Sequence, residues 1–95
     1  MKILAIEKEI NGISNHEYEP HLRDESLKVL ELYEDGVIRE IYFDQSHCAV
    51  IILECNTITE AEEILNKLPL VENKLIKFEI RELKPYLGFS RLVNK

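Results

Sequence analysis

Apolar residues alternate with polar ones in some parts of the chain and recur every three or four residues in others. The first spacing is typical of β-strands and the second of amphipathic helices. Turn-forming residues, such as Asn11-Gly12 and Asp35-Gly36, separate these segments. The pattern predicts strands at residues 3–8, 37–43, 48–55 and 75–83, and helices that begin near Pro20 and near Asn56.

The first predicted helix begins with a proline and ends at a glycine. Pro20 suits a first helical turn, where the missing amide would have no partner, and Gly36 can adopt the left-handed backbone that closes a helix. Between them, four residues recur at three- and four-residue steps, and we expect them to share one face of the helix: Leu22, Ser26, Val29 and Tyr33.

The second predicted helix has three N-cap candidates, Asn56, Thr57 and Thr59. Thr59 and Glu62 have the capping-box spacing, in which two side chains satisfy free amides of the first turn. Pro69 is expected to end this helix, because the residue before a proline is biased away from helical backbone. The apolar face comprises Ile58, Ala61, Ile64, Leu65 and Leu68.

The third predicted strand contains a continuous apolar run from Ala49 to Leu53. Such a run indicates a central strand that is covered on both faces. The order of elements is β-α-β-β-α-β, which is the ferredoxin-like arrangement of class α+β: four antiparallel strands with both helices on one face. The helices cover only one face, so we expect the other face to pack against a second copy, which would form a sheet-to-sheet homodimer.

Length and charge restrict the domain number and the partners. A chain of 95 residues fits one domain, residues 1–95, that gains stability from self-association. The net charge of −6 and the lack of a Lys/Arg stripe argue against nucleic acid as a partner. No apolar run has the length of a membrane span and the N-terminus lacks a signal-peptide pattern, so we expect a cytoplasmic protein with no membrane partner.

The sequence offers few residues for metal, redox or cofactor chemistry. If Cys48 and Cys55 lie on one strand, they are separated by roughly 23 Å at about 3.3 Å per residue, which is too far for a disulfide. His47 is the lone candidate ligand near them, so we expect two reduced thiols and no metal. There is no glycine-rich phosphate loop and no nucleophile paired with a base, and we expect no cofactor.

Residues 63–70, Glu-Ile-Leu-Asn-Lys-Leu-Pro-Leu, form the most distinctive motif of the chain. Together with residues 36–39, Gly-Val-Ile-Arg, and Glu54, this motif resembles the muconolactone isomerase-like proteins of the dimeric α+β barrel superfamily. The resemblance covers about the last two-thirds of the chain. It implies a barrel-forming dimer that can stack into larger rings, with a small-molecule cavity in each subunit. Family enzymes shift a double bond in an unsaturated lactone by moving a proton between carbons.

A proton shift needs a base and a group that stabilises the developing enolate oxygen. Glu54 closes an apolar strand and matches an acidic position of the family, so we expect it to be the catalytic base, with His16 as a second candidate. A structural role for Glu54, paired with Arg39, and solvated histidines remain the alternatives. The residues expected to bind ligand are Arg39, as an anion partner, together with His21, Tyr42 and Tyr86.

These observations favour a small-molecule enzyme that isomerises its substrate by proton transfer in a cavity between the sheet and the helices. Two other functions are compatible with the same residues. One is a non-catalytic ligand-binding or assembly protein, and the other is a cofactor-free monooxygenase of the same superfamily.

Overall fold

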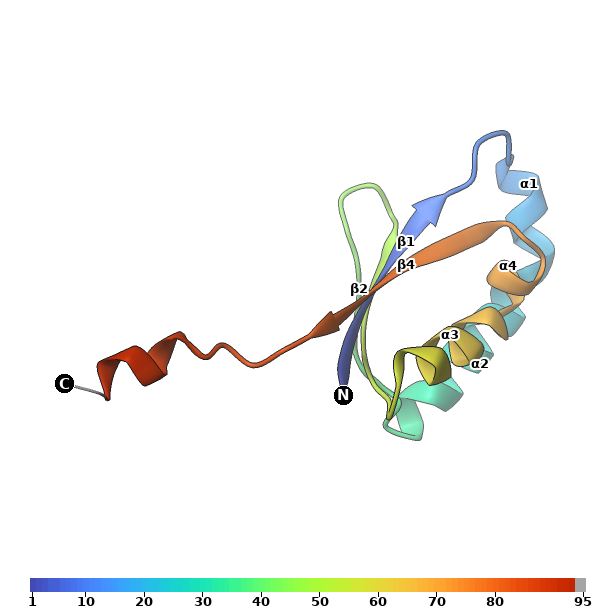
Figure 1. Cartoon of the computed structure of the whole chain (residues 1–95). Helices are drawn as coiled ribbons and strands as arrows, with labels where there is room; N and C mark the ends of the chain where they lie inside the picture. The colour runs from blue at the N-terminus through green and yellow to red at the C-terminus, as the bar shows by residue number, and fades with distance from the viewer. Residues whose placement is uncertain (94–95) are drawn as a thin grey trace.

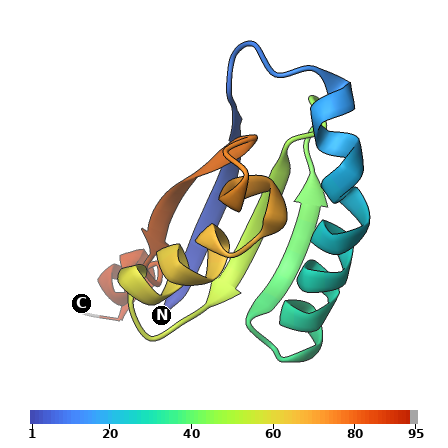
Figure 2. The ribbon, with the colours of Figure 1, turned by 90° about the vertical axis from the view of Figure 1, so that its right-hand side faces the viewer.

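A four-stranded antiparallel sheet, with strand order β2-β3-β1-β4, forms the centre of the computed structural model, which describes residues 1–93. The strands are β1 (Lys2–Glu9), β2 (Ile38–Phe43), β3 (Ala49–Glu54) and β4 (Ile76–Leu83). The helices are α1 (Asn15–Tyr18), α2 (Leu22–Glu34), α3 (Ile58–Asn66) and α4 (Pro69–Glu72), with 3₁₀ turns η1 (Glu19–His21) and η2 (Gly88–Leu92). Figures 1 and 2 show α2, α3 and α4 on the same side of the sheet. This is the ferredoxin-like α+β fold that the element order predicts.

The core lies between the helices and the inner face of the sheet. Because side chains alternate along a strand, Ile3 and Ala5 of β1 share this face with their register partners on β3, Leu53 and Ile51. All four are at most 1 % exposed, and α3 adds Leu65 to the same cluster. The pairing of β3 with both β1 and β2 confirms that the most apolar strand is internal.

Within residues 1–93, no helix covers the outer face of the sheet (Figure 1). Residues at the alternate positions of β1 and β3 project to this side, and they are apolar and only partly buried: Leu4, Ile6, Val50 and Ile52. The apolar run of β3 therefore has one face in the core and one face open.

The end of α2 follows the glycine signal, but its buried face is shifted from the predicted one. Gly36 has φ +79°, and the amides of Gly36 and Val37 donate to the carbonyls of Tyr33 and Leu32, as in a Schellman C-cap. Leu32 is 7 % exposed, whereas Tyr33 is 54 % exposed. The prediction that Tyr33 shares the inward face was wrong. The inward position that follows Val29 is Leu32, three residues later, and not Tyr33, four residues later.

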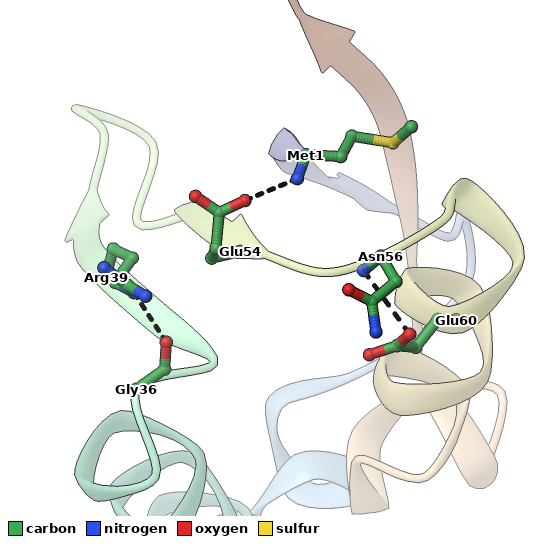
Figure 3. Close-up of polar contacts among 6 residues, drawn as sticks. All are labelled: Met1, Gly36, Arg39, Glu54, Asn56 and Glu60. Atoms are coloured by element: carbon green, nitrogen blue, oxygen red, sulfur yellow. Dashed lines mark hydrogen bonds and ion pairs between the residues drawn. The ribbon is translucent and has the colours of Figure 1, made fainter.

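The N-cap of α3 is Thr57, so the predicted Thr59–Glu62 capping box was wrong. Thr57 Oγ1 accepts from the amide of Glu60 at 3.0 Å, and the Glu60 carboxylate accepts from the amide of Asn56 at 3.4 Å (Figure 3). Thr57 has the extended backbone that an N-cap needs, whereas Thr59 already lies within the helix.

Pro69 separates α3 from α4. The first of these helices ends at Asn66, as the proline predicts, and Leu68 before it has the extended backbone of a pre-proline residue. Pro69 then opens α4 at its first turn, where its missing amide costs nothing. Leu68 is fully buried and Leu70 is 9 % exposed, so the Leu-Pro-Leu segment turns the chain while keeping both leucines in the core.

Beyond β4 the chain continues as a C-terminal arm, residues 84–93, that points away from the rest of the molecule (Figure 1). The arm folds locally, since the rings of Tyr86 and Phe89 meet edge to face with centroids 4.9 Å apart. Its apolar residues are strongly exposed, from 69 % to 79 %: Tyr86, Leu87, Phe89, Leu92 and Val93.

Candidate functional site

A cavity of about 840 Å³ lies between the sheet and the α1–α2 segment. Its volume is in the range of small-molecule binding sites. Residues from α2, β3, α4 and β4 supply apolar walls: Leu22, Val29, Ile51, Leu70, Ile76 and Phe78. The site is therefore built from residues of all parts of the chain except α3 and the C-terminal arm.

Glu7 lines this cavity from β1. It follows Ile3 and Ala5 at the inward positions of the strand, which puts a carboxylate at the edge of the core. Its Oε1 accepts a hydrogen bond from the amide of Ala49 at 2.9 Å. Burial raises the pKa of Glu7, the Ala49 amide partly opposes this effect, and the charge of Glu9 raises the pKa further.

Glu25 lines the same cavity from α2. Its Oε1 accepts from the amide of Leu70 at 2.9 Å, at the start of α4. Leu68, the N-cap of that helix, has no side chain that could accept this bond. Burial raises the pKa of Glu25, the Leu70 amide opposes the rise, and the charge of Glu7 adds to it. The two carboxylates therefore interact electrostatically within one cavity.

The cavity also contains polar groups from α1 and from the β2–β3 turn. The hydroxyl of Tyr18 donates to the carbonyl of Leu75 over 3.4 Å, a long hydrogen bond. His47 lines the cavity from the β2–β3 turn with φ +59°, and its ring centroid is 5.9 Å from that of Phe43. These groups add donors and acceptors near the two carboxylates.

Glu54, the predicted catalytic base, lies on the outer face of the sheet and does not line the cavity. Its Oε2 lies 2.7 Å from the N-terminal nitrogen of Met1, an ion pair seen in Figure 3. The hydrogen bond from the N-terminal ammonium lowers the pKa of Glu54, and the charges of Arg39 and Lys2 contribute in the same direction. Its carboxylate is therefore a weaker base than an ordinary glutamate.

Arg39 and Tyr42 lie together at a second depression, between α2 and β2 and beside the cavity. The Nε of Arg39 donates to the carbonyl of Gly36 at 2.6 Å and makes no ion pair with Glu54 (Figure 3). Tyr42 also lines the main cavity, and its hydroxyl donates to Glu40 at 2.8 Å, which raises the pKa of Tyr42. Tyr42 is thus the predicted ligand-binding residue that the structure places at the cavity.

The remaining predicted residues lie elsewhere. The side chain of His16 is 91 % exposed and lies 4.0 Å from Glu19, and His21 belongs to the turn before α2. Neither histidine lines the cavity, although their neighbours Tyr18 and Glu19 do. Tyr86 is on the C-terminal arm. The catalytic and binding roles of these residues stay predictions.

Comparison with known proteins identifies the fold. No family model and no curated protein matches the sequence. A solved structure of muconolactone isomerase aligns with 93 % of this chain and 93 % of its own, with a TM-score of 0.74 and 14 % identity. The chain has the fold of muconolactone isomerase. A second match is 5-chloro-2-hydroxyhydroquinone dehydrochlorinase from Burkholderia phenoliruptrix, solved with 2,5-dihydroxybenzoquinone; its TM-score is 0.71 at 14 % identity, over 93 % of this chain and 98 % of that one.

The muconolactone isomerase fold agrees with the resemblance carried by residues 63–70 and 36–39. Both similar structures are of small-molecule enzymes, and their identity to this chain is low enough that the likeness concerns the fold. The function must therefore be argued from the residues that line the cavity.

Within the muconolactone isomerase fold, residues 1–93 offer few alternatives to this cavity. No three His, Cys, Asp or Glu side chains in that range are placed to hold a metal ion. No helix in the same range combines the length and the apolar character of a membrane span.

Glu7 and Glu25 were not among the residues predicted from the sequence, although both carry a readable signal. Glu7 continues the alternation of Ile3 and Ala5, and Glu25 lies three residues after Leu22 and four before Val29. A charged residue at an inward position is unusual unless it has a partner or a function. Because the chain is rich in acidic residues, composition conceals this signal.

Proposed function

We propose that the protein is a small-molecule enzyme that isomerises its substrate by proton transfer in the cavity between α2 and the sheet. The observation that supports this proposal is the pair of half-buried carboxylates, Glu7 and Glu25. Burial raises the pKa of both, and a base with a pKa closer to neutrality is better matched to proton transfer at working pH. Within residues 1–93, each carboxylate uses one oxygen for a backbone amide and keeps the other for a ligand.

The two carboxylates can divide the chemistry between them. The ionised one takes a proton from a carbon next to a carbonyl, so that the C–H electron pair forms the double bond of an enol or enolate. The protonated one donates a hydrogen bond to the developing enolate oxygen. Return of the proton to another carbon completes the isomerisation, with no oxidant or cofactor consumed.

Glu54 and His16 remain the alternative bases predicted from the sequence, and Arg39 and His21 the alternative ligand contacts. Glu54 would require a site on the outer face of the sheet, Arg39 a site in the depression between α2 and β2, and the two histidines a site at the surface of α1 and η1. The lowered pKa of Glu54 makes it less suited to accept a proton from carbon.

A non-catalytic ligand-binding protein is the second candidate function. The hydrogen bonds from Ala49 and Leu70 to the two carboxylates favour it, since such bonds also serve to hold the β3 start and the α4 start in place. In that case the cavity would bind a small molecule without changing it.

We also propose that the protein acts as a homodimer joined through the outer faces of its sheets. The partly buried residues Leu4, Ile6, Val50 and Ile52 form the apolar centre of this face. The exposed C-terminal arm provides a second apolar surface, and a ligand contact by Tyr86 requires the cavity of another copy. Small domains commonly gain stability in this way.

The experiment that tests the proposed function is deuterium exchange into candidate substrates. The purified protein is incubated in D₂O with unsaturated lactones and enones, and proton NMR follows exchange and double-bond migration. Glu7→Gln and Glu25→Gln should each lower the rate by about 10²–10⁴-fold, the range for loss of a general acid or base. Glu63→Gln, on the exposed side of α3, is the matched control and should keep the full rate.

Other outcomes assign the chemistry differently. If Glu54→Gln abolishes exchange and the two cavity variants do not, the base is Glu54 and the cavity assignment is wrong. Binding of these compounds without any exchange would favour the ligand-binding protein.

A further inference from the structure

The charged residues that line the cavity are nearly all of one sign. Four carboxylates contribute to its wall: Glu7, Glu9, Glu19 and Glu25. No lysine or arginine of residues 1–93 lines it, and His47 is the sole lining side chain that can become cationic. Arg39, the predicted anion partner, does not line this cavity, and its side chain donates to the carbonyl of Gly36.

This charge distribution disfavours a negatively charged ligand. The charge of Glu7 already acts unfavourably on ionised Glu25, and burial weakens the solvent screening of both. An anion in the cavity would add a further repulsion, whereas a cation would be attracted to the carboxylates that line it. Like-charge contacts of this kind are an effective means of rejecting the wrong ligand.

The carboxylates that line the cavity can accept hydrogen bonds from such a cation. Glu7 and Glu25 come from different elements, and each is held by one backbone amide through its Oε1. A protonated amine has three N–H donors and no acceptor, so carboxylate oxygens are suitable partners for it. The apolar walls at Val29, Ile51 and Phe78 suit an uncharged hydrocarbon or aromatic body.

We propose that the cavity binds a small organic cation, an apolar molecule whose protonated amine is held by the acidic wall that Glu7, Glu9, Glu19 and Glu25 form. The inference rests on the proposed function in using the same cavity, and it names the substrate class. The substrate then differs in charge from the anions that the predicted role of Arg39 requires.

The test compares three probes that share one ring and chain: phenethylamine, phenethyl alcohol and phenylpropanoate. Binding to the full chain is measured by calorimetry and by NMR shift changes at low ionic strength, near neutral pH. The amine should bind at least about tenfold more tightly than the alcohol, and the carboxylate should bind more weakly than either. NMR spectra of each variant check that it is folded.

Glutamine variants of the cavity carboxylates test whether their charge is the cause of the preference for the amine. Glu7→Gln and Glu25→Gln keep an oxygen acceptor for the amides of Ala49 and Leu70, and each should weaken amine binding about tenfold while leaving alcohol binding unchanged. Glu63→Gln, exposed on α3, should change neither affinity.

Four results would overturn the inference. Equal affinity for amine and alcohol would show that the carboxylates do not select charge, and absence of amine binding would show that the cavity is not a site for cations. Preferred binding of the carboxylate would indicate that cations from a second copy, such as Arg91 of its arm, complete the cavity. If the amine binds but no substrate exchanges a proton, the proposed isomerase function is wrong and the cation site stands. If an anionic substrate exchanges a proton, the cation site is wrong and the isomerase function stands.

Discussion

Glu25 on α2 accepts a hydrogen bond from the backbone amide of Leu70 on α4, with the nitrogen and oxygen 2.9 Å apart. These residues are 45 positions apart in the chain. The bond supplies the start of α4 with an acceptor that its own N-cap, Leu68, lacks. One side chain thus lines the cavity and joins the two helices that border it.

Replacing Glu25 with alanine should therefore destabilise the protein. The amide of Leu70 would lose its acceptor, and loss of a capping interaction costs about 0.5–2 kcal/mol. Glu25→Gln keeps an oxygen at the same place and should cost less. Urea unfolding of both variants measures the difference, and faster hydrogen exchange at Leu70 should accompany Glu25→Ala alone. Equal stability of the two variants would contradict the capping role.

The raised pKa of Glu7 predicts a dependence of stability on pH. The folded protein binds this proton more tightly than the unfolded chain, so the free energy of unfolding falls as the pH rises from about 4.5 through the raised pKa. Glu7→Gln removes the buried charge and should raise the Tm at neutral pH by a few degrees, with a flatter profile between these pH values. Thermal unfolding from pH 4 to 8 checks this, with Glu63→Gln as the control.

Glu54 should affect the pH dependence of stability in the opposite direction from Glu7. Its pKa is lowered in the folded protein, so its contribution to stability is present above about pH 4.5 and is lost as the pH falls through the lowered value. Acetylation of the N-terminus removes the ammonium of Met1 and should return the pKa of Glu54 toward its ordinary value. Carbon-detected NMR titration of the Glu54 side-chain carboxyl measures its pKa before and after acetylation. An unchanged pKa after acetylation would show that another group sets it.

Two leucine-to-alanine substitutions, one in the core and one on the C-terminal arm, should differ in their effect on stability. Leu68 is fully buried, and Leu68→Ala should cost about 2–5 kcal/mol through lost burial and the cavity left behind. Leu87 is 75 % exposed, and Leu87→Ala should change the stability of an isolated subunit by less than about 0.5 kcal/mol. Chemical unfolding at low protein concentration compares them. A large loss for Leu87→Ala under these conditions would show that the arm packs against its own chain.

The proposed dimer can be measured directly. Light scattering at micromolar concentration should report twice the subunit mass of 11.2 kDa. Leu4→Lys together with Ile52→Lys places charges on the outer face of the sheet, and the pair should shift the protein to monomer. Val93→Ser, at the end of the arm, tests whether the arm contributes to the same contact. A monomer in the unmodified protein would exclude the sheet-to-sheet dimer.

The sequence by itself determined the features that depend on local chemistry. Gly36 closes α2 because only a residue that tolerates positive φ suits that position, and Pro69 ends one helix and opens another because its ring restricts the preceding residue. Alternating and continuous runs of apolar residues placed the four strands and their order of appearance. Capping was less certain, since Thr57 and Thr59 are each followed by a glutamate three residues later.

Only the tertiary structure decided the candidate site. Glu7 and Glu25 resemble ordinary surface acids until the register of β1 and the packing of α2 bring both to one cavity. Glu54 resembled a buried base because its strand is apolar, but strand alternation turns it to the outer face, where the N-terminus pairs with it. The pKa of a carboxyl depends on what surrounds it in space, and those surroundings come from segments far apart in the chain.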